Sequence, residues 1–354
     1  MTSWMLAAAL GLSATLGDGA PPDRAQIMAV PPELRAQLQT QVIDRGRTQN
    51  ERLRRLLDFM SDGEHGLDMQ YRDDATQTVT EAFLNRQANC VTYTLMFLAL
   101  AQQAGLEAYP QEIQETLSWQ QRDNIVYRTN HVNAGVRIGT RRYTVDVGRD
   151  FVVARHPAQR ISEQRLLAQY YNNRAAMLMS QGQMPLALAY AQIAIELDAV
   201  YPITWSNTGV LRLRSGDLAG AERAYTTALD LDPANSAALF NMVGLYQRTG
   251  DRGKEHLFRR RLEKVQRDDP FHQFLAAAEY ERQGDAARAV KHYQRAIKLH
   301  GSEHRFYYGL ARAYLLSDDH RRARRALERA LALGKDDATR AGYRELLNGL
   351  QQRP

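Results

Sequence analysis

The sequence contains one cysteine, Cys90, among 354 residues. A single thiol excludes an intramolecular disulfide, so the fold depends on its apolar core and not on cross-links. A lone cysteine is most often a small buried hydrophobe, although it also suits an enzyme with one nucleophilic thiol. The residues around Cys90 have to decide between these two interpretations.

Lysine is also scarce, with five positions, although the chain has 46 basic and 40 acidic residues and a net charge of +6. The arginines are interspersed with acidic residues and do not form a tail. Clusters at 259–261 and 321–325 are predicted to be solvated helix faces, with an acidic partner as the alternative. No aromatic residues alternate with them for base stacking, so nucleic acid is not expected as a partner.

Long hydrophobic runs are absent. The uncharged, largely apolar stretch 1–17 is too short for a stable transmembrane span. It is typical of the apolar region of a signal peptide, which would make residues 1–20 a leader and predicts export to the periplasm. The alternatives are a disordered or docked N-terminal segment and a cytoplasmic protein. No metal-binding constellation and no phosphate-binding glycine loop is present, so neither a metal nor a cofactor is expected.

A period of 34 residues runs through the second half of the chain. The aligned segments start at Ala168, Pro202, Ser236, Pro270 and His304. Five copies in register at this spacing are typical of tetratricopeptide repeats, in which each copy forms a pair of helices. The sequence therefore predicts an all-α solenoid over residues 168–337, closed by a cap helix at 338–351.

Small residues recur at fixed positions of each copy. Position 15 is Gly182, Gly216, Gly250, Gly284 and, in the last copy, Asp318. Such a residue can end the first helix in a left-handed conformation. Positions 20 and 27 are alanine in four copies, where two helices can cross closely. The third copy has Glu255 and Leu262 there, so its second helix is expected to pack less tightly.

The first half has a different pattern. Residues 31–59 are predicted to form an amphipathic helix, and residues 78–86 a short one. Cys90 begins the most apolar helix of the chain, which is hydrophobic all round, as buried helices are, and stops at Gly105. Residues 130–138 and 142–147 alternate as the strands of a β-hairpin. An α+β domain is therefore predicted over residues 30–160 of a predominantly helical chain.

Three residues of this first half can do chemistry together. At the N-terminus of a helix, backbone N–H groups favour a thiolate at Cys90 and can receive an oxyanion. His131 lies early in the first hairpin strand and Asp146 late in the second, so the two fall roughly opposite each other. A nucleophile, a base and a residue that orients the base are the components of a catalytic triad. Alone, each is more often structural; it is their order and setting that favour catalysis.

Three stretches resemble the transglutaminase-like superfamily of papain-like cysteine domains: Arg86-Gln87-Ala88-Asn89-Cys90, Asn130-His131-Val132 and Tyr143-Thr144-Val145-Asp146. The resemblance covers roughly residues 70–148, and the whole chain resembles bacterial proteins that join this domain to tetratricopeptide repeats. It implies that Cys90 is the nucleophile, His131 the base and Asp146 the orienting residue.

The sequence departs from the family where glycine commonly precedes the cysteine, since Ala88 and Asn89 stand there. Asn89 either caps the helix or donates to an oxyanion. Trp119 either forms a wall of the cleft or belongs to the core.

Two functions follow from these patterns. The first is a cysteine-dependent acyl-transfer enzyme that hydrolyses or transamidates an amide of a peptide or protein, with repeats that bind the substrate or tether the enzyme. The alternative is a non-catalytic protein-binding scaffold that carries a relic of the cysteine domain.

The repeats themselves predict a groove for a protein or peptide. Position 6 of the first three copies is Asn173, Asn207 and Asn241, and asparagine can both donate to and accept from a peptide backbone. Asparagine is also simply a common residue in such repeats, so both interpretations stand.

Overall fold

The structure is a computed structural model, and it describes residues 20–61, 66–113, 119–122, 125–128, 131–146, 157–334 and 337–351. Residues 119–122 and 125–128 are described by their backbone alone. The predicted signal peptide lies outside the described residues, apart from Ala20. In the described part of the chain, no helix is both long and apolar enough to cross a membrane.

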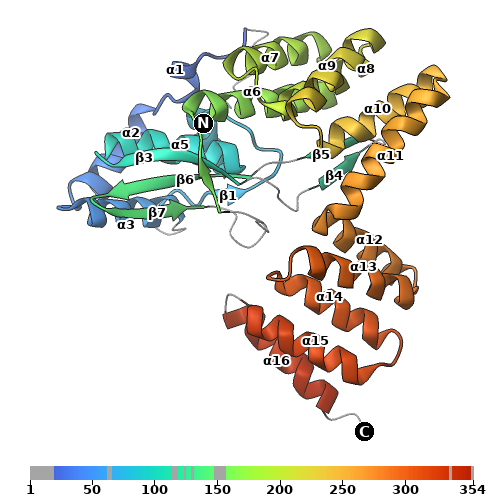
Figure 1. Cartoon of the computed structure of the whole chain (residues 1–354). Coiled ribbons are helices and arrows are strands. Elements are labelled where there is room, and N and C mark those ends of the chain that lie inside the picture. Colours follow the sequence, from blue (N-terminus) through green and yellow to red (C-terminus); the bar gives the residue numbers. More distant parts are fainter. Residues whose placement is uncertain are drawn as a thin grey trace, which may run out of the picture.

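The N-terminal part combines short helices with a small sheet (Figure 1). Its helices are α1 Arg24–Ile27, α2 Pro32–Leu38, the π-helical η1 Gln39–Ile43, α3 Gln49–Ser61, α4 Val79–Asn85 and α5 Cys90–Gln103. The predictions of α4 and α5 agree with these bounds. The single helix predicted over residues 31–59 is wrong, because the chain breaks between η1 and α3.

The break has a local cause at Gly46 and Thr48. A Cβ at Gly46 would lie 2.5 Å from the Arg52 Cγ, so only glycine lets the chain turn this closely against α3. Thr48 then starts the new helix, since its Oγ1 accepts from the Glu51 N–H while a Glu51 carboxylate oxygen accepts from the Thr48 N–H. This reciprocal pair satisfies N–H groups that a helix start leaves without partners.

The strands form one four-stranded sheet and two small pairs. They are β1 Gln70–Tyr71, β2 Gln87–Ala88, β3 Glu107–Ile113, β4 Trp119–Arg122, β5 Ile125–Arg128, β6 His131–Ile138, β7 Arg141–Val145 and β8 Gln159–Arg160. The sheet is antiparallel in the order β7-β6-β3-β8. The predicted hairpin is present as β6 and β7, with Gly139 at a φ of 59° in its turn. Strand β3, in the middle of the sheet, was not predicted.

Helix α5 is the centre of the N-terminal part. Of its residues, Leu95, Met96, Phe97 and Leu100 are fully buried. It packs against β3 and β6 of the sheet and also against α6, the first helix of the repeats. It ends as predicted at Gly105, which has a φ of 71°. The following Leu106 N–H donates to the Ala101 carbonyl at 2.9 Å, which closes the last turn.

The second half consists of helix pairs followed by one more helix (Figure 1). The pairs are α6 Glu163–Ser180 with α7 Met184–Leu197, α8 Pro202–Arg214 with α9 Leu218–Leu231, α10 Ser236–Thr249 with α11 Arg252–Asp268, α12 Pro270–Arg282 with α13 Ala286–Leu299, and α14 His304–Leu315 with α15 His320–Leu333. The last helix is α16 Asp337–Gln351.

The recurring small residues have the roles that the period predicts. The four glycines at position 15 have φ values of 77–86°, and Asp318 takes the same left-handed conformation with a φ of 54°. The alanines at position 20, among them Ala221 and Ala289, are fully buried. In the third pair, only Phe258 and Leu262 of α11 are buried, so this helix contributes little to the core.

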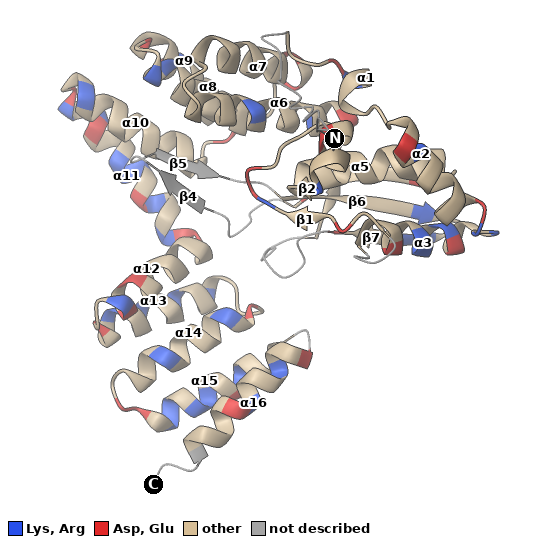
Figure 2. Ribbon diagram, turned by 180° about the vertical axis from the view of Figure 1, so that it is seen from behind, with Lys and Arg blue, Asp and Glu red and all other residues tan. Residues whose placement is uncertain are grey.

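The apolar core has a cluster that spans the two halves and a separate cluster inside the N-terminal part, and it is interrupted inside the repeats. One cluster joins Cys90, Leu95 and Val132 to Tyr170 of α6 and extends to Leu262 of α11. A separate cluster begins at Ala277 and holds α12–α16 together. Figures 1 and 2 show α12–α16 as a group away from the sheet.

Candidate functional site

Cys90 is the first residue of α5 and is 9% exposed. Asn89 caps the helix, because its Oδ1 accepts from the Thr92 N–H at 3.0 Å. Its Nδ2 donates to Thr76 Oγ1 at 2.6 Å, so both ends of the amide are engaged within the chain. Of the two roles considered for Asn89, the structure therefore contains the helix cap. Ala88 is fully buried.

The loop before α4 encloses the start of α5. The Asn89 N–H donates to the Ala75 carbonyl at 3.1 Å, and Thr92 Oγ1 donates to the same carbonyl at 3.0 Å. These bonds fix the position of the helix end that carries the thiol. Thr76, which bonds to Asn89, is 1% exposed.

His131 and Asp146 form the predicted pair. The His131 Nε2 lies 2.7 Å from Asp146 Oδ1, and both side chains are less than a tenth exposed. Asn133 Nδ2 donates to the other carboxylate oxygen, Asp146 Oδ2, at 3.0 Å. Asn133 therefore orients the Asp146 carboxylate, and this carboxylate in turn orients the imidazole of His131. Because Ala134 pairs with Val145, Asp146 extends beyond the paired part of β7 toward these two side chains.

Cys90 completes the arrangement. It lies beside the imidazole of His131, within reach of a hydrogen bond to it. Burial lowers the pKa of His131, but the hydrogen bonds to Asp146 and Cys90 and their charges outweigh it and raise the pKa to about 9. An imidazole beside the sulfur can accept its proton and later return a proton to a leaving group.

Two tyrosines beside this group were not identified from the sequence. Burial and the nearby Cys90 and Asp73 raise the pKa of Tyr71, whose hydroxyl is hydrogen-bonded to Asp73. Burial and Asp146 raise the pKa of Tyr93 to about 12. Tyr71 pairs with Ala88 in the short parallel ladder just before Cys90, and it remains a neutral donor next to the thiol. No sequence motif marks these residues.

The role predicted for Trp119 stays a prediction. Trp119 lies in β4, and its side chain lies outside the described residues, as does Asn130. Among the described residues, no cluster of three or more His, Cys, Asp or Glu side chains is placed to hold a metal ion.

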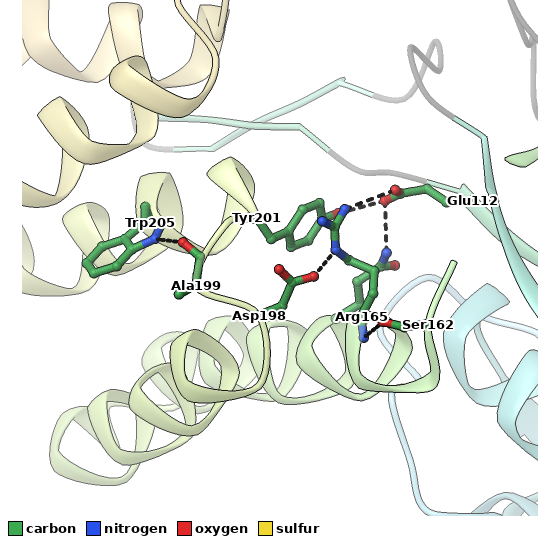
Figure 3. Close-up of polar contacts among 8 residues, drawn as sticks. Glu112, Ser162, Arg165, Asp198, Ala199, Tyr201 and Trp205 are labelled. Carbon is green, nitrogen blue, oxygen red and sulfur yellow. Dashed lines mark hydrogen bonds and ion pairs between the residues drawn. The ribbon is translucent and has the colours of Figure 1, made fainter. Parts of the chain in front are cut away.

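The sheet is attached to the first repeats through Glu112 of β3, which is 1% exposed (Figure 3). Its carboxylate accepts from Gln169 Nε2 at 2.9 Å and from Tyr201 Oη at 3.0 Å, and it pairs with Arg165 at 3.4 Å. Arg165 also bonds to Asp198 and stacks over the Tyr201 ring. The buried carboxylate of Glu112 is thus paired with Arg165, and this pairing offsets the cost of burying the charge.

Of the three asparagines predicted to form a clamp, Asn207 has a hydrogen bond inside the chain, whereas the buried Nδ2 of Asn241 has no partner among the described residues. Asn207 Nδ2 donates to Asn172 Oδ1 at 3.1 Å, so the partner in the first repeat is Asn172 and not Asn173. Asn241 is 4% exposed. The backbone of β5 lies against α10 and α8, and α5 and β3 lie against α6. The first helices of the first three repeats are therefore in contact with the N-terminal part.

Three arginines of the basic clusters are paired with acidic neighbours. Arg259 pairs with Glu255 at 2.5 Å, Arg322 with Asp319 at 3.4 Å and Arg324 with Glu328 at 3.0 Å. Figure 2 shows acidic and basic residues interspersed along the repeat helices. This agrees with solvated helix faces.

Two family models match the chain, and both are described as tetratricopeptide repeat. They cover residues 207–251 and 281–343. The C-terminal half therefore contains tetratricopeptide repeats, as predicted. Both matches lie outside residues 70–148, so they give the transglutaminase-like resemblance no support.

Solved structures of repeat proteins are similar to half of the chain. YrrB, a tetratricopeptide repeat protein with an unusual peptide-binding site, is 16% identical, with 50% of this chain and 92% of YrrB covered and a TM-score of 0.27. MamA from Desulfovibrio magneticus RS-1 is 17% identical, with 49% and 96% covered and a TM-score of 0.28. PilF of Pseudomonas aeruginosa is 14% identical, with 54% and 95% covered and a TM-score of 0.29. These low scores carry no functional argument, and no curated protein matches the chain.

Proposed function

We propose that the tetratricopeptide repeats of this chain bind an extended segment of a partner protein. The observation that carries this proposal is the run of repeats itself, since stacked helix pairs of this kind present extended binding surfaces. The comparisons favour this scaffold function over catalysis, because they match the repeats alone.

The fourth and fifth repeats supply the surface for the partner, because the first helices of the other three contact the N-terminal part. Arg312 of α14 pairs with Glu281 of α12 at 2.9 Å and stacks over Tyr308 one turn away, at 5.0 Å from the ring centroid. Arginine and tyrosine in such positions are typical of residues that dominate protein interfaces. Leu275, on α12, is 43% exposed.

The test is selection of binders from a displayed random-peptide library with the full chain, followed by calorimetric titration. Arg312→Ala should weaken binding of a selected peptide about tenfold, the effect of about 1.4 kcal/mol. Arg325→Ala, an exposed change on the second helix of the same repeat, is the matched control and should leave affinity unchanged. Equal losses in both variants, or no selected peptide, would contradict the proposal.

A second candidate function rests on a separate observation, the contact series Cys90–His131–Asp146. We propose that the N-terminal part is a transglutaminase-like domain within residues 30–160 and that it transfers acyl groups. Export to the periplasm is part of the same proposal and depends on residues 1–20.

The reaction would use the chain's own groups as follows. The Cys90 thiolate attacks the carbonyl carbon of an amide, the C–S bond forms, and the electron pair moves to the oxygen, where N–H groups at the start of α5 receive it. The tetrahedral intermediate collapses, the C–N bond breaks, and His131 gives its proton to the leaving amine. His131 then removes a proton from water, which attacks the thioester and releases the acid and the Cys90 thiolate.

The test for this second function is mass-spectrometric detection of cleavage in a library of peptides. Wild type should produce new termini, and Cys90→Ala should produce none while its helical circular dichroism stays unchanged. Cleavage that persists in Cys90→Ala would rule out the assignment of the nucleophile.

A further inference from the structure

The first repeat reaches into the part of the molecule that holds Cys90. Arg174 of α6 is 8% exposed, although it carries a full charge. Its Nη1 donates to the Thr76 carbonyl at 3.2 Å, and its buried Nε has no hydrogen-bond partner among the described residues. Since a buried guanidinium is costly to leave without partners, the bond to Thr76 matters for the placement of both groups and holds the loop at Thr76 against the repeat.

The same loop residue leads to the thiol. Thr76 Oγ1 accepts from Asn89 Nδ2, and Asn89 caps the helix that Cys90 begins. Arg174 is therefore connected to the nucleophile through two side chains, each of them buried. If the Arg174 contact is lost, the Thr76 carbonyl loses its donor, and the Asn89 cap is held in place less firmly.

A second set of contacts links α6 to the strand that carries His131. Gln169 of α6 donates to Glu112 of β3. In the register of the sheet, Glu112 pairs with Val132, and the next residue, Ile113, pairs with His131. Helix α6 thus contacts the loop that positions Cys90 and the strand that positions His131.

We propose that Arg174, a residue of the first repeat, is a positioning residue for the Cys90–His131 pair, so that the repeat array forms part of the scaffold of the reactive site. This inference rests on the proposed acyl-transfer function. It places the alignment of thiol and imidazole under the control of α6, and it predicts that a change in the first repeat alters thiol reactivity without touching either residue.

The test follows alkylation of Cys90, the one cysteine of the chain, by iodoacetamide across pH, with mass spectrometry as the readout. In wild type, the reaction should already be fast in mildly acidic solution, because His131 lies beside the sulfur. Arg174→Met should slow alkylation in this acidic range on the order of tenfold, the effect expected when a hydrogen bond to a charged group is lost. Arg174→Lys should restore part of the rate.

The chain offers a matched control at the other end of α5. Arg52 is a partly buried arginine that donates to the Ala104 carbonyl at 3.1 Å and to the Gly46 carbonyl at 2.9 Å. Arg52→Met removes a comparable side chain, this one from α3, and with it a hydrogen bond to the C-terminal end of α5. It should leave the alkylation profile unchanged at a similar loss of stability. A general loss of packing would slow both variants alike and would overturn the proposal.

Two failures are distinguishable. A wild-type thiol that does not react in mildly acidic solution would overturn the acyl-transfer function and the positioning role with it. A wild type with an activated thiol and an Arg174→Met profile that overlays it would overturn the positioning role alone. If Arg174→Met does not fold, Thr76→Val removes the acceptor of Asn89 without a change of charge. It should slow alkylation in the same direction, and an unchanged profile would contradict the inference.

Discussion

His131 shows how far the environment of one side chain can move its chemistry. Its two hydrogen bonds, to Asp146 and Cys90, exist only in the folded chain, and they raise its pKa to about 9 despite burial. An unfolded histidine titrates at about 6.5. Between these two values the folded chain holds a proton that the unfolded chain has released.

This difference predicts a pH-dependent stability. The contribution of His131, about 3 kcal/mol, should be fully present below pH 6.5 and should be lost as pH rises through about 9, because folding takes up a proton in this window. Urea denaturation of wild type at several pH values measures the slope. His131→Gln lacks the titrating group and should be flatter between pH 6.5 and 9.

Other histidines act in a different window. Burial lowers the pKa of His272 and of His292, so their contributions are lost as pH falls below 6.5 and do not enter the range above it. Equal slopes in wild type and His131→Gln would show that His131 is not held in the charged form.

The site residues that could be predicted were those whose place in a helix or strand could be recognised from the sequence. Cys90 opens an apolar helix, and His131 and Asp146 lie on neighbouring strands, so their sequence positions indicate their proximity. Tyr71 and Arg174 have no such pattern. They reach the site from a short strand and from a repeat helix, and only the folded chain brings these segments together.

Elements with a local cause were predictable. The repeat helices follow from residues that act within one copy, such as a left-handed position 15 and small residues where helices cross. Strand β3 was missed because it contains Pro110 and Glu112, which pattern analysis assigns to the surface. Glu112 is buried because its partners, Gln169 and Tyr201, come from other elements.

The crossing of two helices in one repeat predicts a steric effect. Ala289 of α13 is fully buried, so Ala289→Leu should destabilise the fourth repeat by about 1–3 kcal/mol through overpacking. Ala287→Leu, on the exposed side of the same helix, is the control and should change little. Guanidinium titration of both variants measures the difference. Equal midpoints would mean that the helices do not cross closely at position 20.

The apolar clusters of the molecule are separated at a different place from the domain boundary that the sequence predicts. The sequence indicates a boundary near residue 160, but the apolar core crosses it and is instead interrupted between α11 and α12. The weak packing of the third repeat was visible in Glu255 and Leu262. The burial of the first repeat by the N-terminal part could not be seen in the sequence, because it results from contacts between segments that are distant along the chain.

This interruption predicts unfolding in two steps, with α12–α16 as one cooperative unit and the rest as the other. The chain has three tryptophans, Trp4, Trp119 and Trp205, and all precede α11, so fluorescence reports the first unit alone. Circular dichroism reports both. Denaturation curves from the two probes should differ, and Ala289→Leu should shift only the dichroism step. Coincident curves would show a single unit.

The burial of α6 also determines the order in which the chain can fold during synthesis. On a ribosome, a nascent chain that ends before Glu163 lacks the helix against which Cys90, Val91 and Leu95 pack. At roughly 5–20 residues per second, α6 is added within a few seconds, but until it leaves the exit tunnel this apolar surface of α5 has no cover. The start of α5 would therefore reach its final packing only as the first repeat docks.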